Sequence, residues 1–260
     1  MAFSAVSVVR GPGELAAMVV EVTKRIFTTP FQFREFLEQA WFITSVTLMP
    51  TILVSIPFGA VISLQVGNLT GQLGAQSFAG ATAVLAVTRE AAPIAAAMII
   101  AGAAGSAICS DMGARKIREE IDAMEVLGVD PLARLIAPRV VASAFVAVIP
   151  LYIVALCASY LSPRLITTLI YGQSSGTYDH YFLQFLPPVD MLWSFGKLIF
   201  LAVSIILIHC YYGYTASGGP AGVGMAVGRA IRTSIVTVVV ADFFLSFAIW
   251  GSTTTVRITG

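Results

Sequence analysis

Residues 140–161 read VVASAFVAVIPLYIVALCASYL and contain no Asp, Glu, Lys or Arg. About 20 predominantly apolar residues are needed for a helix to cross the hydrocarbon core of a bilayer, and this run is long enough. Similar apolar stretches occur at roughly residues 41–65, 78–109, 191–212 and 231–250. The sequence therefore predicts five membrane-spanning helices, with 140–161 as the third.

The composition of the whole chain agrees with this prediction. Of its 260 residues 57% are hydrophobic and 11% are charged, whereas soluble proteins carry about 25% charged residues. A water-soluble core of this size cannot hide so much apolar surface. The predicted fold class is an all-α polytopic membrane protein. The net charge of +1 gives no sign of the basic surface that binds nucleic acid.

The distribution of Lys and Arg predicts the orientation. Basic residues concentrate in cytoplasmic loops. Most of the 15 basic residues precede the first span or lie in the second and fourth loops: Arg10, Lys24, Arg25 and Arg34; Arg115, Lys116, Arg118, Arg134 and Arg139; Arg229 and Arg232. We expect an inner (plasma) membrane protein with a cytoplasmic N-terminus and an extracytoplasmic C-terminus.

Residues 1–40 form a separate N-terminal region, followed by the spans in 41–260. Apolar residues recur at helical spacing between charged ones at Leu15, Met18, Val19, Val22 and Ile26. This pattern predicts an amphipathic helix within 13–39 that lies in the membrane interface and bends near Pro30. A cytosolic tail helix is the alternative.

The second cytoplasmic loop, residues 111–131, reads DMGARKIREEIDAMEVLGVDP. We expect a short helix with Asp111 as its N-cap, Gly128 as its C-cap and Pro131 as its stop. Arg118 and Asp122 can pair at i,i+4. Such a helix fits either docking into the groove of a soluble partner or a solvated connector, and the residue pattern alone favours neither.

Several motifs together resemble one family. They are TREAAP at 88–93, AGAAG at 101–105, EEIDAMEVLGVDP at 119–131, PRVVA at 138–142, Lys197, CYYGY at 210–214, GGPAGVG at 218–224 and Asp242. This set resembles the MlaE and YrbE permease family of ABC-type lipid transporters, over residues from about 40 to the C-terminus.

The resemblance implies a non-catalytic permease subunit that moves a hydrophobic lipid, such as a fatty acid, phospholipid or sterol. It implies a second permease subunit, a cytosolic ABC ATPase dimer that binds ATP and Mg²⁺, and MCE-domain substrate-binding proteins. This chain itself has no G-x-x-x-x-G-K-[ST] motif and needs no cofactor. The coupling helix contacting the ATPase would comprise Glu119, Glu120, Asp122, Ala123, Met124, Glu125 and Leu127.

Departures from the common family pattern point to a branch. Ala91 and Ala92 stand where Phe-Gly is common, and Ala103 stands where Arg is common. These changes suit a YrbE subunit of an actinobacterial Mce system. That branch implies pairing with a non-identical YrbE rather than a homodimer, and import rather than export.

Four charged residues fall inside or near predicted spans: Arg89, Glu90, Lys197 and Asp242. Charges at membrane depth cost at least about 2.5 kcal/mol each and need partners or a wet cavity. We expect Arg89 to pair with Asp242, in a structural role or in the substrate path. Lys197 either snorkels to the outer surface or offers a cation to an acidic lipid headgroup.

Two connecting segments also carry expectations. The outer segment 171–188 is rich in Tyr, Phe and Pro, and predicts a short helix that docks an extracytoplasmic partner or forms an aromatic belt. The glycine-rich segment 213–228 predicts a tight cytoplasmic turn that binds no nucleotide.

Two other function classes remain as alternatives. A secondary transporter would use the four intramembrane charges as a relay. An intramembrane lipid-modifying enzyme would need a nucleophile with a base, or paired carboxylates, and the sequence has no G-x-S-x-G, H-E-x-x-H or paired aspartates.

Overall fold

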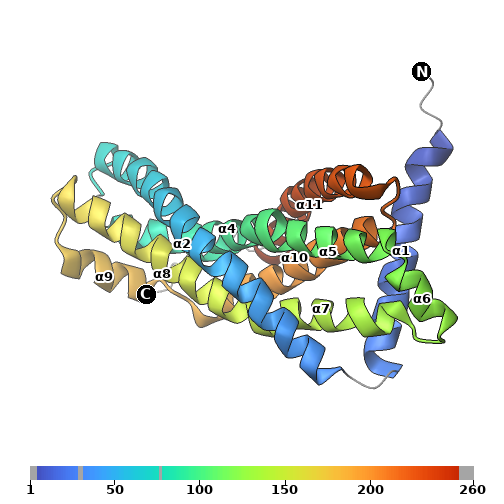
Figure 1. The fold of residues 1–260 in the computed structure, drawn as a ribbon. Helices are drawn as coiled ribbons and strands as arrows, with labels where there is room; N and C mark the ends of the chain where they lie inside the picture. Colours follow the sequence, from blue (N-terminus) through green and yellow to red (C-terminus); the bar gives the residue numbers. More distant parts are fainter. Residues whose placement is uncertain (1–4, 29–31, 76–77, 252–260) are drawn as a thin grey trace. The chain divides into compact units, whose positions relative to one another are not determined.

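The computed structural model describes residues 5–28, 32–75 and 78–251, and the secondary structure of this part of the chain is helical (Figure 1). Five helical stretches are long and apolar enough to cross a membrane: Phe33–Gln72, Ala79–Ile117, Leu132–Leu169, Pro188–Tyr214 and Gly219–Trp250. The prediction of a polytopic all-α membrane protein with five spans is confirmed.

The elements follow one another in the order α1 (Ala5–Thr28), α2 (Phe33–Gln72), α3 (Ala79–Ala86), η2 (Val87–Ala91), α4 (Ala92–Ile99), η3 (Ile100–Gly105), α5 (Ser106–Ile117), α6 (Glu120–Val126), η4 (Leu132–Ile136), α7 (Ala137–Ala142), η5 (Ser143–Ala147), α8 (Val148–Leu169), α9 (Ser175–Gln184), α10 (Pro188–Tyr214) and α11 (Gly219–Trp250). The elements labelled η are π-helical segments.

The N-terminal region is helical, as predicted, but its boundary differs. α1 ends at Thr28, and α2 starts at Phe33 and runs on through Pro50 and Pro57. Residues 33–39 therefore belong to the first span rather than to the amphipathic helix. The bend expected near Pro30 lies outside the described residues.

The second span contains two π-helical segments. In η2 the chain widens just before Pro93, and the amide of Ala92 bonds to the carbonyl of Val87, five residues back. A proline has no N–H, and its ring clashes with the carbonyl four residues earlier, so a local π-turn relieves a clash that a regular α-helix would contain.

The glycine-rich segment is mostly helix rather than turn. α10 continues to Tyr214 and α11 begins at Gly219, which leaves only residues 215–218 between them. Gly218 and Gly219 have φ of +87° and +68°, a conformation that glycine adopts without strain. Pro220 then fits the first turn of α11, where a missing N–H costs nothing.

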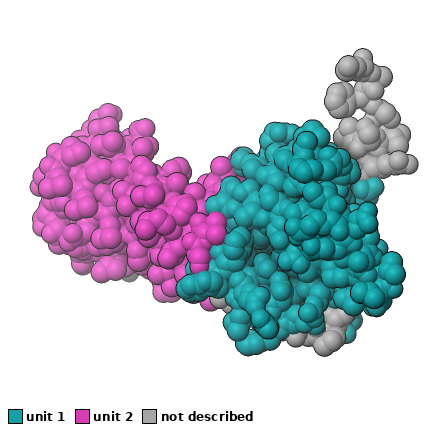
Figure 2. Space-filling model, in the orientation of Figure 1, with its two compact units in different colours: residues 1–44, 100–147, 202–237 teal, residues 45–99, 148–201, 238–260 magenta. Residues whose placement is uncertain are grey.

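The chain divides into two compact units (Figure 2). Unit 1 comprises residues 1–44, 100–147 and 202–237, and its core includes Cys109, Ala216, Ala226 and Ala230. Unit 2 comprises residues 45–99, 148–201 and 238–260, and its core includes Ala83, Val84, Tyr178 and Phe182. Every contact described below lies within one unit.

The short outer helix predicted within 171–188 is present as α9 and packs on α3 in unit 2. Tyr178 and Phe182 are buried against α3. Gly80 makes this close approach possible, because a β-carbon there would lie 2.5 Å from the carbonyl oxygen of Tyr178. Burial raises the pKa of the Tyr178 hydroxyl above its usual range.

Candidate functional site

The loop between the second and third spans contains the first candidate site, in unit 1. Its helix starts later than predicted, because α5 continues through Ile117. Asp111 lies inside α5 and does not cap a helix, since its carboxylate pairs with Arg115 at 3.2 Å and Arg139 at 2.6 Å. The N-cap prediction was wrong because the apolar face that anchors α5, including buried Met112, extends past Asp111.

The break between α5 and α6 lies at Glu119, which has φ +59° in the left-handed region. This break changes the expected ion pairs. Arg118 pairs with Glu120 at 2.8 Å, and Lys116 pairs with Asp122. The predicted pair of Arg118 with Asp122 was wrong, because the reversal at residue 119 removes the i,i+4 register on which it depended.

The C-terminal end of α6 is as predicted. Gly128 has φ +73°. Its amide bonds to the carbonyl of Glu125 at 3.0 Å, and the amide of Val129 bonds to that of Met124 at 2.9 Å. These two bonds form a Schellman motif, which satisfies carbonyls that the helix end would otherwise leave unpaired.

Two neighbouring elements, α1 and α10, hold α6 and the turn after it. Ile121 is fully buried. The Tyr214 hydroxyl at the end of α10 donates to Glu125 Oε1 at 2.6 Å. Arg25 of α1 forms an ion pair with Asp130, and this hydrogen bond is the main cause that raises the pKa of Arg25. The turn is thus tied to α1 and to α10.

The outward surface of α6 is both acidic and apolar. Glu119, Glu120, Asp122, Ala123 and Glu125 are exposed, and Met124 is half-buried. The adjacent side chains of Val126 and Leu127 are 87% and 78% exposed. Exposed aliphatic side chains beside carboxylates form a surface that a partner protein can cover.

The second candidate site is a buried charge cluster in unit 2. The Lys197 side chain is fully buried. Its Nζ lies 3.0 Å from Glu90 Oε2 and 2.9 Å from Asp242 Oδ1, and it donates to Ser246 Oγ at 2.9 Å and to the carbonyl of Arg89 at 2.6 Å. The snorkelling alternative for Lys197 was wrong, because carboxylates from two other spans compensate its charge inside the bundle.

Arg89 pairs with a residue that sequence analysis missed. Its Nη2 lies 2.6 Å from Asp190 Oδ2, and Trp250 Nε1 donates to Asp190 Oδ1 at 3.1 Å. The guanidinium also lies 5.1 Å from the centroid of the Trp250 ring, a cation–π distance. The predicted pair of Arg89 with Asp242 was wrong. Asp190 lies in the first turn of α10, just outside the predicted span.

A cavity of about 320 Å³ borders the charge cluster. Glu90, Asp242 and Ser246 form the polar part of its wall, and Ile94, Val238, Val239 and Phe243 form the apolar part. The structure thus brings three of the four predicted intramembrane residues together and leaves Arg89 in an adjacent pair. Among the described residues, no group of three or more His, Cys, Asp or Glu side chains is placed to hold a metal ion.

Comparison with known proteins identifies the family. Residues 36–248 match the family described as Permease MlaE. A probable ABC transporter permease protein of Pyropia yezoensis is 31% identical over 88% of this chain and 87% of its own length. A probable ABC transporter permease of Synechocystis is 30% identical over 75% of this chain and 74% of its own.

A plant relative extends the comparison. The chloroplastic protein of Arabidopsis thaliana named TRIGALACTOSYLDIACYLGLYCEROL 1 is 30% identical over 87% of this chain and 64% of its own length. With five apolar spans and a family match over most of its length, the chain belongs to the MlaE permease family, whose members are non-catalytic, multi-pass permease subunits of ABC transporters.

Proposed function

We propose that this chain is the membrane-spanning half of an ABC transporter that moves a hydrophobic lipid between the plasma membrane and an MCE-protein conduit. A separate cytosolic ATPase dimer binds ATP and Mg²⁺ and supplies the energy. A second permease subunit completes the membrane core. The N-terminus is cytoplasmic and the C-terminus extracytoplasmic.

The observation that carries this proposal is the surface of α6. Buried Ile121 and the bonds of Glu125 and Asp130 hold α6 and the following turn against the rest of unit 1. The side chains of Val126 and Leu127 remain exposed. Burying each of these two side chains in a partner groove contributes roughly 1.5–3 kcal/mol. Because α10 contacts α6 and α1 contacts the turn after it, a movement of α6 on binding the ATPase would be transmitted to the membrane-spanning helices. A coupling helix requires such a connection.

Two observations support a lipid as the substrate. The cavity beside Glu90 and Asp242 has both an apolar and a charged wall, which matches an amphipathic molecule. One relative carries the name of a lipid, trigalactosyldiacylglycerol. We further propose, from the sequence departures at Ala91, Ala92 and Ala103, an actinobacterial YrbE-type subunit that imports lipid beside a non-identical partner.

A secondary transporter is the competing function, and the buried cluster of Lys197 with Glu90 and Asp242 is the observation that favours it. Ionisable groups at membrane depth can relay protons. Such a transporter would work without α6 binding an ATPase, so the test of α6 separates the two.

The test is co-purification from the native membrane of the wild type and of V126E/L127E. Both side chains are exposed, so the double variant should fold normally. We expect the wild type to bring an ABC ATPase and MCE-domain proteins, and the variant to lose only the ATPase.

The matched control is Leu183→Glu, a side chain that is 67% exposed in α9, a helix outside the five membrane-spanning stretches. It should keep the ATPase and lose the MCE-domain partner. Absence of any ATPase from the wild-type sample would reject the coupling-helix proposal and favour the secondary transporter.

A further inference from the structure

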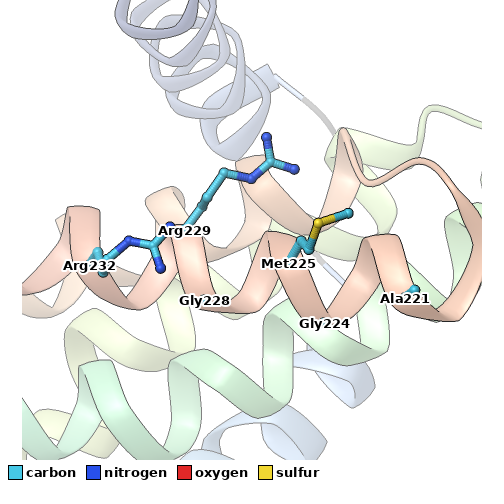
Figure 3. A pocket seen from close by; sticks show the side chains of 6 residues that line it. All are labelled: Ala221, Gly224, Met225, Gly228, Arg229 and Arg232. Atoms are coloured by element: carbon cyan, nitrogen blue, oxygen red, sulfur yellow. The ribbon is translucent and has the colours of Figure 1, made fainter.

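The first part of α11 contains an open cavity of about 690 Å³ in unit 1. Figure 3 shows its six lining residues along this helix: Ala221, Gly224, Met225, Gly228, Arg229 and Arg232. The cavity therefore lies on an outward face of a single helix, and its lining up to Gly228 falls in the segment that sequence analysis predicted to be a turn.

Two unneutralised cations border this cavity. Both Arg229 and Arg232 are exposed, and neither makes a hydrogen bond or an ion pair with any residue within 5–28, 32–75 and 78–251. In contrast, Arg25, Arg118 and Arg139 of unit 1 each pair with a carboxylate. Guanidinium groups form their strongest hydrogen bonds with carboxylate and phosphate anions.

The floor of the cavity is open helix backbone. No heavy atom lies within 4 Å of the position that a β-carbon on Gly224 would take. At Gly228 the nearest atom to that position is Nη1 of Arg232, at 3.6 Å, so the Arg232 side chain turns back over the glycine. In Figure 3 the Arg229 side chain extends away from the helix.

Exposed apolar side chains flank the cations. Met225 and Val236 are each 62% exposed. The spacing of residues 225, 229, 232 and 236 puts them on one helix face. The most apolar 18-residue window of α11 has a mean hydropathy of 1.9 and is 17% buried. A cationic pair between aliphatic groups is complementary to a ligand with an anionic head and apolar tails.

We propose that this face of α11 binds the phosphate of an anionic phospholipid through Arg229 and Arg232, with an acyl chain running from the arginines along Val236 toward the membrane interior. The membrane character of α11 favours a lipid phosphate over a soluble one. Basic residues at this end of a span would lie at the level of the cytoplasmic headgroups, where anionic lipids concentrate. The proposal takes the membrane orientation from the proposed function but needs neither the ATPase nor transport, so its test is separate from the test of α6.

The test uses the purified permease in nanodiscs of phosphatidylglycerol and phosphatidylcholine in equal amounts, with retained lipid identified by native mass spectrometry. We expect the wild type to retain phosphatidylglycerol preferentially. R229Q/R232Q should lower that preference by about fivefold for each arginine removed. R229K/R232K should lower it less, since lysine keeps the charge but loses the planar fork.

Two further variants make the result specific. Gly224→Leu adds a side chain at the floor of the cavity, where a β-carbon meets no heavy atom within 4 Å, and should reduce retention while both arginines remain. Lys24→Gln removes an exposed cation of α1 outside the cavity and should change nothing. Equal thermal unfolding and elution volume of all variants will show that folding is intact.

Three outcomes would overturn the proposal. The first is an unchanged lipid preference in R229Q/R232Q. The second is displacement of phosphatidylglycerol by millimolar inorganic phosphate with no effect of Gly224→Leu, which would indicate a soluble-anion site. The third is a change in the mass of the permease assembly rather than in its lipid content, which would make this face an interface between subunits.

Discussion

The hydroxyl of Tyr214, the last residue of α10, donates a 2.6 Å hydrogen bond to the carboxylate of Glu125 in α6. This single bond ties the end of the fourth span to the helix that we propose contacts the ATPase. The ring of Tyr214 also faces Lys116, whose Nζ lies 5.7 Å from its centroid. Tyr214 thus joins the ends of two spans to α6.

Tyr214→Phe should weaken the attachment of α6 by about 1 kcal/mol, the usual net value of one hydrogen bond. We expect less ATPase recovered in co-purification and nearly unchanged thermal unfolding. Tyr212→Phe is the matched control, because it removes a bond from the same helix end to Thr233 and not to α6. Equal loss of ATPase in both variants would reject the role of Tyr214.

Arg25→Gln should loosen the turn after α6, because its ion pair with Asp130 connects α1 to that turn. The pair is partly exposed, so we expect amide exchange in residues 120–131 to quicken by no more than about fivefold. Arg34→Gln is the control, since its pair with Glu38 lies within α2. Unchanged exchange in the Arg25 variant would contradict the attachment.

Attachment of α9 should depend on pH. Asp179 accepts hydrogen bonds from Arg164 at 2.7 and 2.9 Å and from the Tyr160 hydroxyl at 2.6 Å, and its pKa is lowered chiefly by the Arg164 bond. A carboxyl with a lowered folded-state pKa contributes stability above its unfolded pKa of about 3.9, and that stability is lost as pH falls toward the folded value.

The measurement is amide exchange of residues 175–184 against pH, corrected for the intrinsic pH dependence. We expect protection to be steady at neutral pH and to fall in acid below the ordinary carboxyl range. Asp179→Asn should already lack that protection at neutral pH. An identical pH profile in the wild type and the variant would show that this ion pair does not hold α9.

Lys197→Met should destabilise the membrane-embedded bundle by about 3 kcal/mol, because it leaves the carboxylates of Glu90 and Asp242 without their cation. K197M/D242N should recover part of this loss, since it removes the more buried of the two carboxylates. Thermal unfolding in nanodiscs measures both. A double variant no more stable than K197M would show that Lys197 does not act through Asp242.

The sequence predicted the spans because a bilayer demands long apolar runs, and residues 140–161 leave no other interpretation. It did not predict where the helices end. Residues 33–39 and 219–230 are too polar or too glycine-rich to read as spans, yet packing within unit 1 makes them helical. Ala226 and Ala230 illustrate this packing, since both are buried in the core of unit 1.

The sequence singled out Arg89, Glu90, Lys197 and Asp242 as charges that need partners, but the one pair that it proposed was wrong and Asp190 was missed. Arg89 and Glu90 lie in the π-helical segment η2, where the 100° rotation per residue used to place side chains on a helix does not hold. The π-helical turn directs Arg89 toward Asp190 and Glu90 toward Lys197. The spacing of apolar residues in the sequence does not reveal such a turn. The reversal at Glu119 was equally hidden, because glycine is the usual signal for a left-handed residue.

The left-handed backbone of Glu119 affects how substitutions at this position change stability and assembly. A left-handed conformation costs a non-glycine residue roughly 1–2 kcal/mol, and Glu119 accepts that cost while its exposed side chain forms no ion pair with any residue that the structure describes. Glycine would adopt the same backbone without strain, so Glu119→Gly should raise the melting temperature. If the same change weakens binding of the ATPase, stability and assembly make opposite demands on one residue, and a screen for thermostable variants would select against a working transporter.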